Sequence, residues 1–318
     1  SLLKGATIND KLYFASGSIS AAGILQTFVM SVNMAKIDAD DTLTDPRELA
    51  QEGLWTMEEF YKICRNAYLD TNSEVSGKDP GDTFGYIGMD SVVGDAFLAS
   101  NGLKYLSTDD EGKLIIAPEF RGSAIYDLSR DLIACFKSDD YYYPTSYSFD
   151  IFTEGRAVLA GTSFLVLMKN REKMNDRYGY LPFPKADTEQ KEYYSTSGFP
   201  YTMWSMTTYC ENTERAAYVM EALASGGYRT VQPKVYDLLK YRGQDDPINA
   251  KMFDLIVSSK TYDMGRIFAN EFDWEDSPVA LFRKRLYNNT SDDWYSALNG
   301  KAENMQRVID NINSRFGY

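Results

Sequence analysis

Strand-like and helix-like segments alternate over the first 136 residues, and this order limits the possible folds more than any other feature of the chain. Short apolar stretches typical of β-strands occupy residues 11–14, 28–32, 84–88 and 113–116. Longer segments with apolar residues at helical spacing occupy residues 56–67, 90–101 and 118–136. A chain in which strands and helices follow one another in this way is expected to form a layered α/β structure.

Two of the expected helices have recognisable ends. Thr56 is a candidate N-cap, and Glu59, three residues later, would complete a capping box. Trp55 stands before the cap at the position of a hydrophobic staple, so we expect it to be a packing residue and not a ligand contact. Asn101-Gly102 is a typical C-terminal stop for the next helix.

The second half of the chain has a different pattern. Leu181-Pro-Phe-Pro184 is incompatible with a helix and predicts a crossing between two lobes. Residues 193–208 are rich in Tyr, Ser and Thr and are expected to form strand and loop. Helices are expected at residues 213–224, 229–241, 246–259, 276–287 and 301–315. Gly226-Gly227 is expected to connect the first two of these helices.

The residue composition excludes several kinds of site. Histidine is absent, so no Ser-His-Asp or Cys-His catalytic site and no His-ligated zinc can exist within these 318 residues. The net charge of −13 argues against a nucleic-acid partner, because such affinity depends on Lys and Arg contacts with phosphate. The longest apolar stretch, residues 157–168, is shorter than the roughly 20 residues of a membrane-spanning helix.

No metal or cofactor is predicted. The three cysteines are widely spaced: Cys64, Cys135 and Cys210. We expect them to be small buried apolar residues, since they form no disulfide framework or metal-binding spacing. Asp70-Thr-Asn-Ser-Glu74 has the spacing of a calcium loop, but Val75 and Gly81 stand where that loop needs Gly and Glu.

Five short motifs resemble those of one family. They are Asp10-Lys-Leu-Tyr-Phe14, Val29-Met-Ser-Val-Asn33, Gly53-Leu-Trp-Thr-Met-Glu-Glu-Phe60, Phe152-Thr-Glu-Gly-Arg-Ala-Val-Leu159 and Tyr178-Gly-Tyr-Leu-Pro-Phe-Pro-Lys185. In this order, the motifs resemble the extracellular solute-binding protein family 1, the carbohydrate-binding components of ABC importers. The resemblance covers residues 10–225; it departs from the family at Asp10, where family members often have Gly.

The resemblance implies a fold and a division of the chain. The expected fold is α/β and periplasmic-binding-protein type II-like, mainly the second lobe with a helical C-terminal return. Family members carry a first lobe of about a hundred residues, the size of a small domain, before the Lys11-Leu-Tyr-Phe14 strand, so the first lobe is expected to be truncated here. Residues 1–182 would hold the hinge strand and second-lobe α/β region, residues 183–225 a returning segment of the first lobe, and residues 226–318 the helical end of the second lobe.

The resemblance also implies where a ligand would lie. It places the loop Gly161-Thr162-Ser163-Phe164 at the cleft, with glycine allowing a close backbone approach and Phe164 as a stacking platform. The alternative is that Phe164 begins a buried helix. Asp90 and Ser91 open a helix at the carboxyl end of a strand, where α/β proteins bind ligands, although Asp90 would also serve as a helix cap.

Further candidates are aromatic or polar, because sugar rings need flat aromatic faces and hydrogen-bonding groups around the rim. The resemblance places Ser197, Gly198, Phe199, Tyr201 and Trp204 in the returning segment, where Trp204 would stack on a sugar or lie in a sheet. Tyr142, within Tyr141-Tyr-Tyr-Pro144, would belong to an aromatic rim or to a packed loop.

The function implied by the resemblance is that of a monomeric extracellular protein, tethered to the membrane as a lipoprotein in its full-length form. It would capture a saccharide by lobe closure and deliver it to a membrane permease, without catalysis and without a nucleic-acid partner. Two alternatives stay open. A glycoside hydrolase works with two carboxylates and needs no histidine, and an adhesive surface protein would lack a cleft.

Overall fold

The computed structural model describes residues 7–9, 11–71, 76–142, 149–198, 202–241, 246–288 and 294–318, without the side chains of residues 90–93, 241 and 288. Its strands are β1 (Thr7–Ile8), β2 (Lys11–Leu12), β3 (Phe28–Asn33), β4 (Phe84–Ile87), β5 (Leu106–Thr108), β6 (Leu114–Ile116), β7 (Tyr141–Tyr142), β8 (Ala157–Ser163) and β9 (Tyr178–Leu181). Its α-helices are α2 (Ala22–Leu25), α3 (Met34–Asp38), α4 (Pro46–Glu52), α5 (Met57–Cys64), α6 (Asp90–Ser100), α7 (Ser123–Lys137), α8 (Asp150–Thr153), α9 (Phe164–Asn170), α10 (Thr213–Tyr236), α11 (Pro247–Ser258), α12 (Met264–Ile267), α13 (Pro278–Asn288) and α14 (Trp294–Arg315). Short 3-10 and π turns are η1 (Pro118–Arg121), η2 (Arg171–Lys173), η3 (Asp237–Tyr241), η4 (Ala269–Glu271) and η5 (Trp274–Asp276).

A mixed five-stranded sheet forms the centre of the fold, in the order β7-β4-β8-β3-β9. β3 pairs antiparallel with both β8 and β9, and β4 pairs parallel with β8 and β7. Every residue of β3 and β8 is buried. Strands of this kind, apolar or small along their whole length, are typical of a sheet that is covered on both faces.

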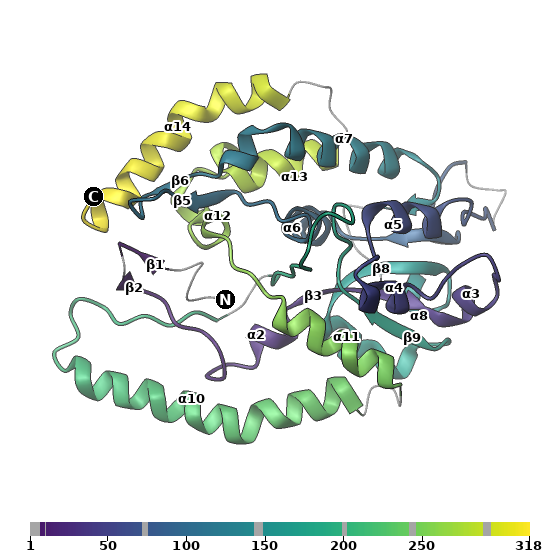
Figure 1. Cartoon of the computed structure of the whole chain (residues 1–318), viewed down its shortest axis with the longest axis horizontal. Coiled ribbons are helices and arrows are strands. Elements are labelled where there is room, and N and C mark those ends of the chain that lie inside the picture. The colour runs from purple at the N-terminus through teal and green to yellow at the C-terminus, as the bar shows by residue number, and fades with distance from the viewer. Residues whose placement is uncertain are drawn as a thin grey trace.

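Helices surround this sheet (Figure 1). α13 packs against α6 and α7, and α14 contacts β6 in the two-stranded β5-β6 sheet. α4 and α11 both contact β9. α7 shows why such packing occurs, because Ile125, Leu128, Leu132 and Phe136 form one buried stripe at helical spacing.

The expected α/β architecture is confirmed. The strands expected at 28–32, 84–88 and 113–116 correspond to β3, β4 and β6, and the helix expected at 90–101 corresponds to α6. The helix expected at 118–136 is divided into η1 and α7 at Gly122. In the described part of 193–208, strand-like pairing is limited to isolated bridges at Ser195, Ser197 and Trp204.

Two local expectations need correction. Residues 46–52 form a helix that was not predicted, α4: Asp45 caps it, Pro46 occupies the first turn, and Gly53 ends it at φ 74°. Thr56 does lie at the N-cap of α5, but its side chain makes no cap hydrogen bond, so the predicted capping box is wrong. Trp55 is fully buried as expected, and its indole donates to the Pro182 carbonyl oxygen at 3.0 Å.

α10 is the other departure. It runs unbroken through Gly226-Gly227, so the predicted connection between two helices is wrong, and it also crosses the domain boundary predicted at residue 225. The helix lies along the lower edge of the molecule in Figure 1 and has no buried residue. Its exposed apolar side chains include Tyr218, Leu223 and Tyr228.

Two further observations bear on site chemistry. Across the described residues, no helix is both long and apolar enough to cross a membrane, and no group of three or more His, Cys, Asp or Glu side chains is arranged to hold a metal ion. All three cysteines are free; Cys64 is buried as expected, whereas Cys135 and Cys210 are half-buried.

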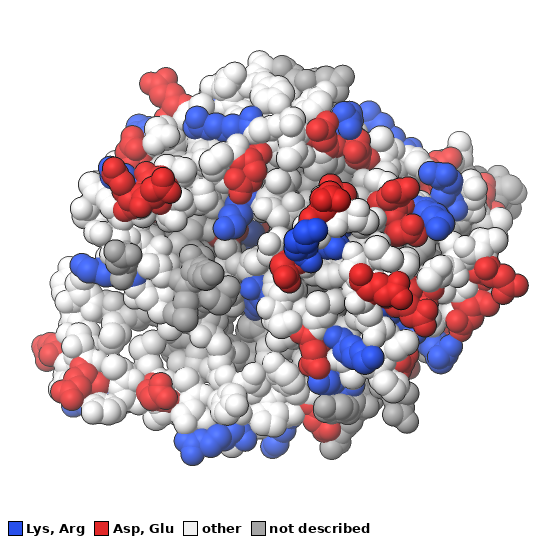
Figure 2. Space-filling model, viewed as in Figure 1, with Lys and Arg blue, Asp and Glu red and all other residues white. Residues whose placement is uncertain are grey.

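On the face shown in Figure 2, basic side chains are interspersed with acidic ones.

Candidate functional site

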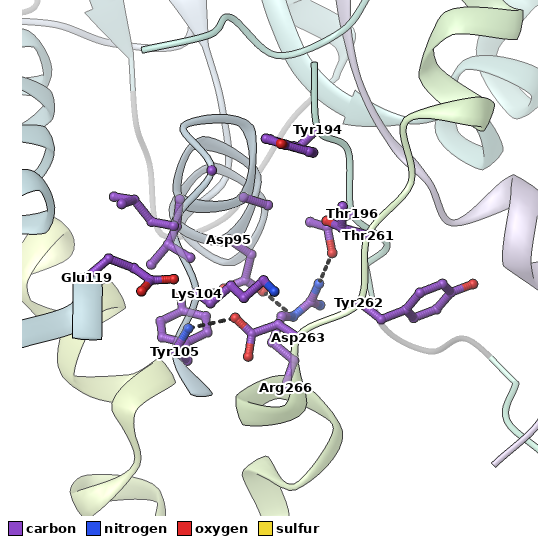
Figure 3. Close-up of a pocket in the computed structure, with 14 residues that line it drawn as sticks. Asp95, Lys104, Tyr105, Glu119, Tyr194, Thr196, Thr261, Tyr262, Asp263 and Arg266 are labelled. Atoms are coloured by element: carbon purple, nitrogen blue, oxygen red, sulfur yellow. Dashed lines mark hydrogen bonds and ion pairs between the residues drawn. The ribbon is translucent and has the colours of Figure 1, made fainter. Parts of the chain in front are cut away.

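The most prominent cavity in the described part of the chain has a volume of about 460 Å³. Three segments far apart in the sequence enclose most of it: the end of α6 with residues 102–105, residues 194–196, and residues 261–266 (Figure 3). Glu119 of η1 completes the lining. Gly102 and Lys104 are exposed, so the cavity is accessible from solvent.

The base of the cavity is a buried ion cluster centred on Asp95 of α6. The Asp95 side chain is fully buried, and its carboxylate lies 2.9 Å from Nε of Arg266 and 3.1 Å from Nε of Arg283. It also accepts a hydrogen bond from the Tyr105 hydroxyl at 3.0 Å. Burial by itself would raise the pKa of Asp95, but the charges of Arg266 and Arg283 hold this pKa below its ordinary value.

Arg266 of α12 connects this cluster to residues 195–198. Its Nη1 donates to Oγ1 of Thr196 at 3.2 Å and to the Ser197 carbonyl oxygen. The Arg266 guanidinium also lies over the Phe28 ring, 5.8 Å from its centroid. A charged group held from several sides in this way is fixed in position and presents a defined hydrogen-bonding surface to the cavity.

Asp263 forms one wall. As the N-cap of α12, it accepts backbone hydrogen bonds from Tyr105 at 2.6 Å, Leu106 at 3.3 Å and Gly265 at 2.6 Å. Burial raises the pKa of Asp263 to about 6, although these three hydrogen bonds and the charge of Arg266 act in the opposite direction. The Asp263 carboxylate therefore changes charge near neutral pH.

Tyr194 supplies an aromatic surface at the edge of the cavity. The ring is half-buried and packs against Gly102, where an added Cβ would lie 3.5 Å from the ring. In Figure 3 Tyr194 lies at the top of the cavity and Glu119 at one side, whereas the Tyr262 ring points away. The cavity thus combines one flat aromatic face with carboxylates, hydroxyls and cations, as a binding pocket for a polar organic molecule requires.

The loop at 161–164, which the family resemblance placed at a cleft, lies in the core. Phe164 is fully buried, with ring-centroid distances of 5.3 Å to Tyr180 and 5.1 Å to Phe253. A Cβ at Gly161 would overlap the Tyr86 hydroxyl, so this glycine allows a close approach by another side chain of the protein. Thr162 is buried in β8, and Ser163 caps α9 by accepting from the Val166 amide.

The other predicted site residues are dispersed. Tyr142 lies in strand β7, not in a loop; it is half-buried and stacks on Phe84 at 4.8 Å. Trp204 is 37% exposed, and its backbone pairs with Ala15. Ser197 and Gly198 are buried, and a Cβ on Gly198 would contact the Phe28 ring.

Four predicted residues cannot be placed as side chains. The backbone of Asp90 and Ser91 opens α6 as expected, while their side chains lie outside the described residues. Phe199 and Tyr201 also lie outside the described residues. The segment that contains Ser197 does reach the cavity, through its neighbour Thr196.

The residues that line the cavity were not predicted from the sequence. Two of them, Asp95 and Asp263, stand in sequence patterns that could have indicated their roles. Asp95 is a carboxylate within the otherwise apolar helix segment 92–98, where burial would require a charged partner. Asp263 stands two residues before Gly265, as the N-cap of a short helix. Tyr194 had no distinguishing pattern, because residues 193–208 are rich in aromatic residues throughout.

Comparison with known proteins shows the fold. No protein-family model matches the chain, and no curated protein sequence matches it either. Solved structures do match: the extracellular solute-binding protein from Staphylococcus aureus in complex with maltose has a TM-score of 0.59 at 12% identity, over 98% of this chain and 74% of that one. The maltose/maltodextrin-binding domain MalE from Bdellovibrio bacteriovorus, bound to maltotriose, has a TM-score of 0.57 at 14% identity, over 97% and 76%. UgpB from Mycobacterium tuberculosis, in complex with glycerophosphocholine, has a TM-score of 0.57 at 12% identity, over 98% and 74%.

These structures confirm the expected periplasmic-binding-protein type II-like fold. The chain therefore shares the fold of these solute-binding proteins, and it spans about three quarters of the length of each structure named. Two of the three are described with an oligosaccharide, and the third with glycerophosphocholine.

Proposed function

We propose that this protein is an extracellular solute-binding protein that captures a neutral saccharide in the Asp95–Asp263 cavity and delivers it to the permease of an ABC importer. The observation that carries the proposal is the cavity itself, in which the Tyr194 ring faces a set of fixed polar groups. A sugar presents a C–H face that packs on an aromatic ring and a rim of hydroxyls that need donors and acceptors. The shared fold and the sugars bound by two of its representatives support this assignment.

The charges around the cavity favour a neutral ligand. Three carboxylates (Asp95, Glu119 and Asp263) and two cations (Lys104 and Arg266) line the cavity, and a third cation, Arg283, pairs with Asp95 from outside the lining. A cavity with both signs and no net excess offers donors and acceptors to hydroxyl groups without attracting an ion.

Binding would act through a shift between open and closed arrangements. A ligand that touches Tyr194 on one side and Asp263 on the other makes contacts that exist only when both segments are in place. Because the ligand binds the closed arrangement more tightly than the open one, it shifts the protein toward the closed arrangement. The importer would recognise this closed form.

Transport without catalysis is favoured over glycoside hydrolysis. A hydrolase needs two carboxylates available to the scissile bond. Here Asp95 is paired with two guanidinium groups and Tyr105, and Asp263 accepts three backbone hydrogen bonds. These two carboxylates are therefore held in structural contacts, which leaves Glu119 as a single carboxylate where a hydrolase needs two.

A thermal-shift screen of the 318-residue chain against neutral mono- and oligosaccharides tests the proposal. A ligand that binds only the folded state raises the melting temperature in proportion to the logarithm of its excess over Kd. We expect at least one neutral saccharide to do so, and uronic acids and amino sugars of the same ring to have a smaller effect. If charged solutes or peptides stabilise the protein and no neutral sugar does, the assignment is wrong.

A further inference from the structure

A second, smaller cavity lies beside the first and differs from it in chemistry. It has a volume of about 160 Å³ and is enclosed by residues 17–27, including α2, by the end of α10, and by residues 257–262. Tyr262 lines both cavities, and its ring points away from the Asp95 cluster in Figure 3. The two cavities are therefore neighbours that share Tyr262 and otherwise have different linings.

The walls of this second cavity are mostly aliphatic. Ile24 of α2, Val231 and Val235 of α10, and Val257 of α11 line it. At the α10 side, the Ser18 hydroxyl donates to Oε1 of Gln232 at 2.5 Å, which orients the Gln232 amide so that its N–H₂ group remains a donor. A ligand here would bury a short apolar chain and meet polar groups at one end.

Lys260 makes the cavity distinctive, because its cation has no matching anion. Among the described residues, no carboxylate forms an ion pair with Lys260, and its Nζ donates to the Gly23 carbonyl oxygen. The ammonium also lies over the Tyr262 ring, 5.2 Å from the centroid. An ammonium group has three donors, so one carbonyl leaves capacity for a further acceptor.

The charge that acts on Lys260 from its surroundings is also positive, because it comes from Arg266. Tyr262 and Tyr236 are the neighbouring phenols, and α2 contributes no ionisable side chain. Burial, followed by the charge of Arg266, lowers the pKa of Lys260 to about 8. An uncompensated cation in a desolvated setting is costly, and an anion that entered the cavity would relieve that cost.

We propose that this cavity is a binding site for a small aliphatic carboxylate, whose carboxylate group pairs with Lys260 while its chain lies against Ile24, Val231 and Val235. The volume fits a molecule of only a few heavy atoms and excludes a sugar ring with substituents. This site binds its anion whether or not the larger cavity binds a saccharide, since the two ligands differ in charge and size.

Isothermal titration of the 318-residue chain with sodium 3-methylbutanoate tests the site, with 3-methylbutanamide as the uncharged isostere. We expect saturable binding of the carboxylate and none of the amide. Because binding requires the protonated amine, affinity at pH 9 should be about tenfold weaker than at pH 7, one unit on either side of the Lys260 pKa. Saturation with the carboxylate should also raise the Lys260 pKa measured by ¹³C NMR.

Matched variants locate the site. Lys260→Met removes the charge at nearly constant length and should abolish binding, whereas Lys251→Met, on the exposed face of α11, should leave it intact. Val231→Trp, at a position 44% exposed on the rim, should block the cavity without disturbing the core. Equal binding of the amide, unchanged binding by Lys260→Met, or no saturable binding of the carboxylate would each overturn the proposal.

Discussion

The Phe164 ring is a core side chain in this structure, and that placement has a measurable consequence. Removing a fully buried phenylalanine leaves a cavity among Tyr180, Phe253 and their neighbours. Phe164→Ala should therefore lower the free energy of unfolding by about 3–5 kcal/mol, measured by urea denaturation.

The matched control for this substitution is Tyr209→Ala, since Tyr209 is 92% exposed. It should change the free energy of unfolding by no more than about 0.5 kcal/mol. If Phe164→Ala leaves stability unchanged and instead removes saccharide binding, the ring faces a ligand, as the family resemblance implied, and its place in the core is wrong.

The raised pKa of Asp263 predicts that the free energy of unfolding depends on pH. Its pKa is raised from 3.8 to about 6, so between these values the folded state holds a proton that the unfolded state has lost. The stability that this group contributes is fully present below pH 3.8 and is lost as pH rises through 6.

The difference in unfolding free energy between the wild type and Asp263→Asn isolates this contribution, because other carboxylates titrate in both proteins. From pH 4 to pH 7 the wild type should lose on the order of 2 kcal/mol relative to the variant. A difference that stays constant over this range would show that Asp263 titrates normally.

At the scale of elements, α10 offers a pair of adjacent positions with opposite expected effects. A Cβ at Gly226 would meet no atom within 4 Å, whereas a Cβ at Gly227 would overlap the Ser18 carbonyl oxygen. Gly226→Ala should stabilise the protein by about 0.5–1 kcal/mol through the higher helix propensity of alanine. Gly227→Ala should destabilise it, because the contact is with backbone that cannot rotate away.

Thermal unfolding of both variants checks this prediction. Similar shifts in melting temperature for the two substitutions, in either direction, would mean that α10 does not pack on residues 17–19 as described. The comparison also tests the continuity of the helix, since two helices joined at Gly226-Gly227 would respond to alanine differently.

Some helices and strands could be predicted from the sequence and others could not. β3, β4 and α7 were predicted because burial on one or both faces leaves a periodic apolar pattern. α10 was not predicted as one helix, because the close approach of Ser18 to Gly227 is a tertiary contact that no local pattern reports. α4 was not predicted, although Asp45, Pro46 and Gly53 are the residues expected at the two ends of such a helix.

The candidate site was less predictable for a physical reason. Asp95, Tyr194 and Asp263 lie on three segments separated by scores of residues, and only the fold brings these segments together around one cavity. The family resemblance pointed to residues 161–164 instead, where burial against Tyr86 and Phe253 leaves no open face. Sequence motifs thus identified the fold well and the cavity poorly.

At the scale of the whole molecule, the protein has a known fold and a cavity whose polar groups are held in place by the buried ion cluster around Asp95. The fold alone does not determine the ligand, since the structures that share it are described with maltotriose, maltose and glycerophosphocholine. The proposal of a neutral sugar rests on the mixture of acidic and basic side chains around the cavity and on the Tyr194 ring at its edge.

The most direct test is calorimetric titration of the wild type, Tyr194→Ala and Tyr209→Ala with the saccharide that gives the largest thermal shift. We expect Tyr194→Ala to weaken binding by at least tenfold, because it removes the aromatic face, and Tyr209→Ala, the exposed tyrosine outside the cavity, to bind as the wild type does. Equal affinity for all three proteins would contradict the assignment of this cavity as the saccharide site.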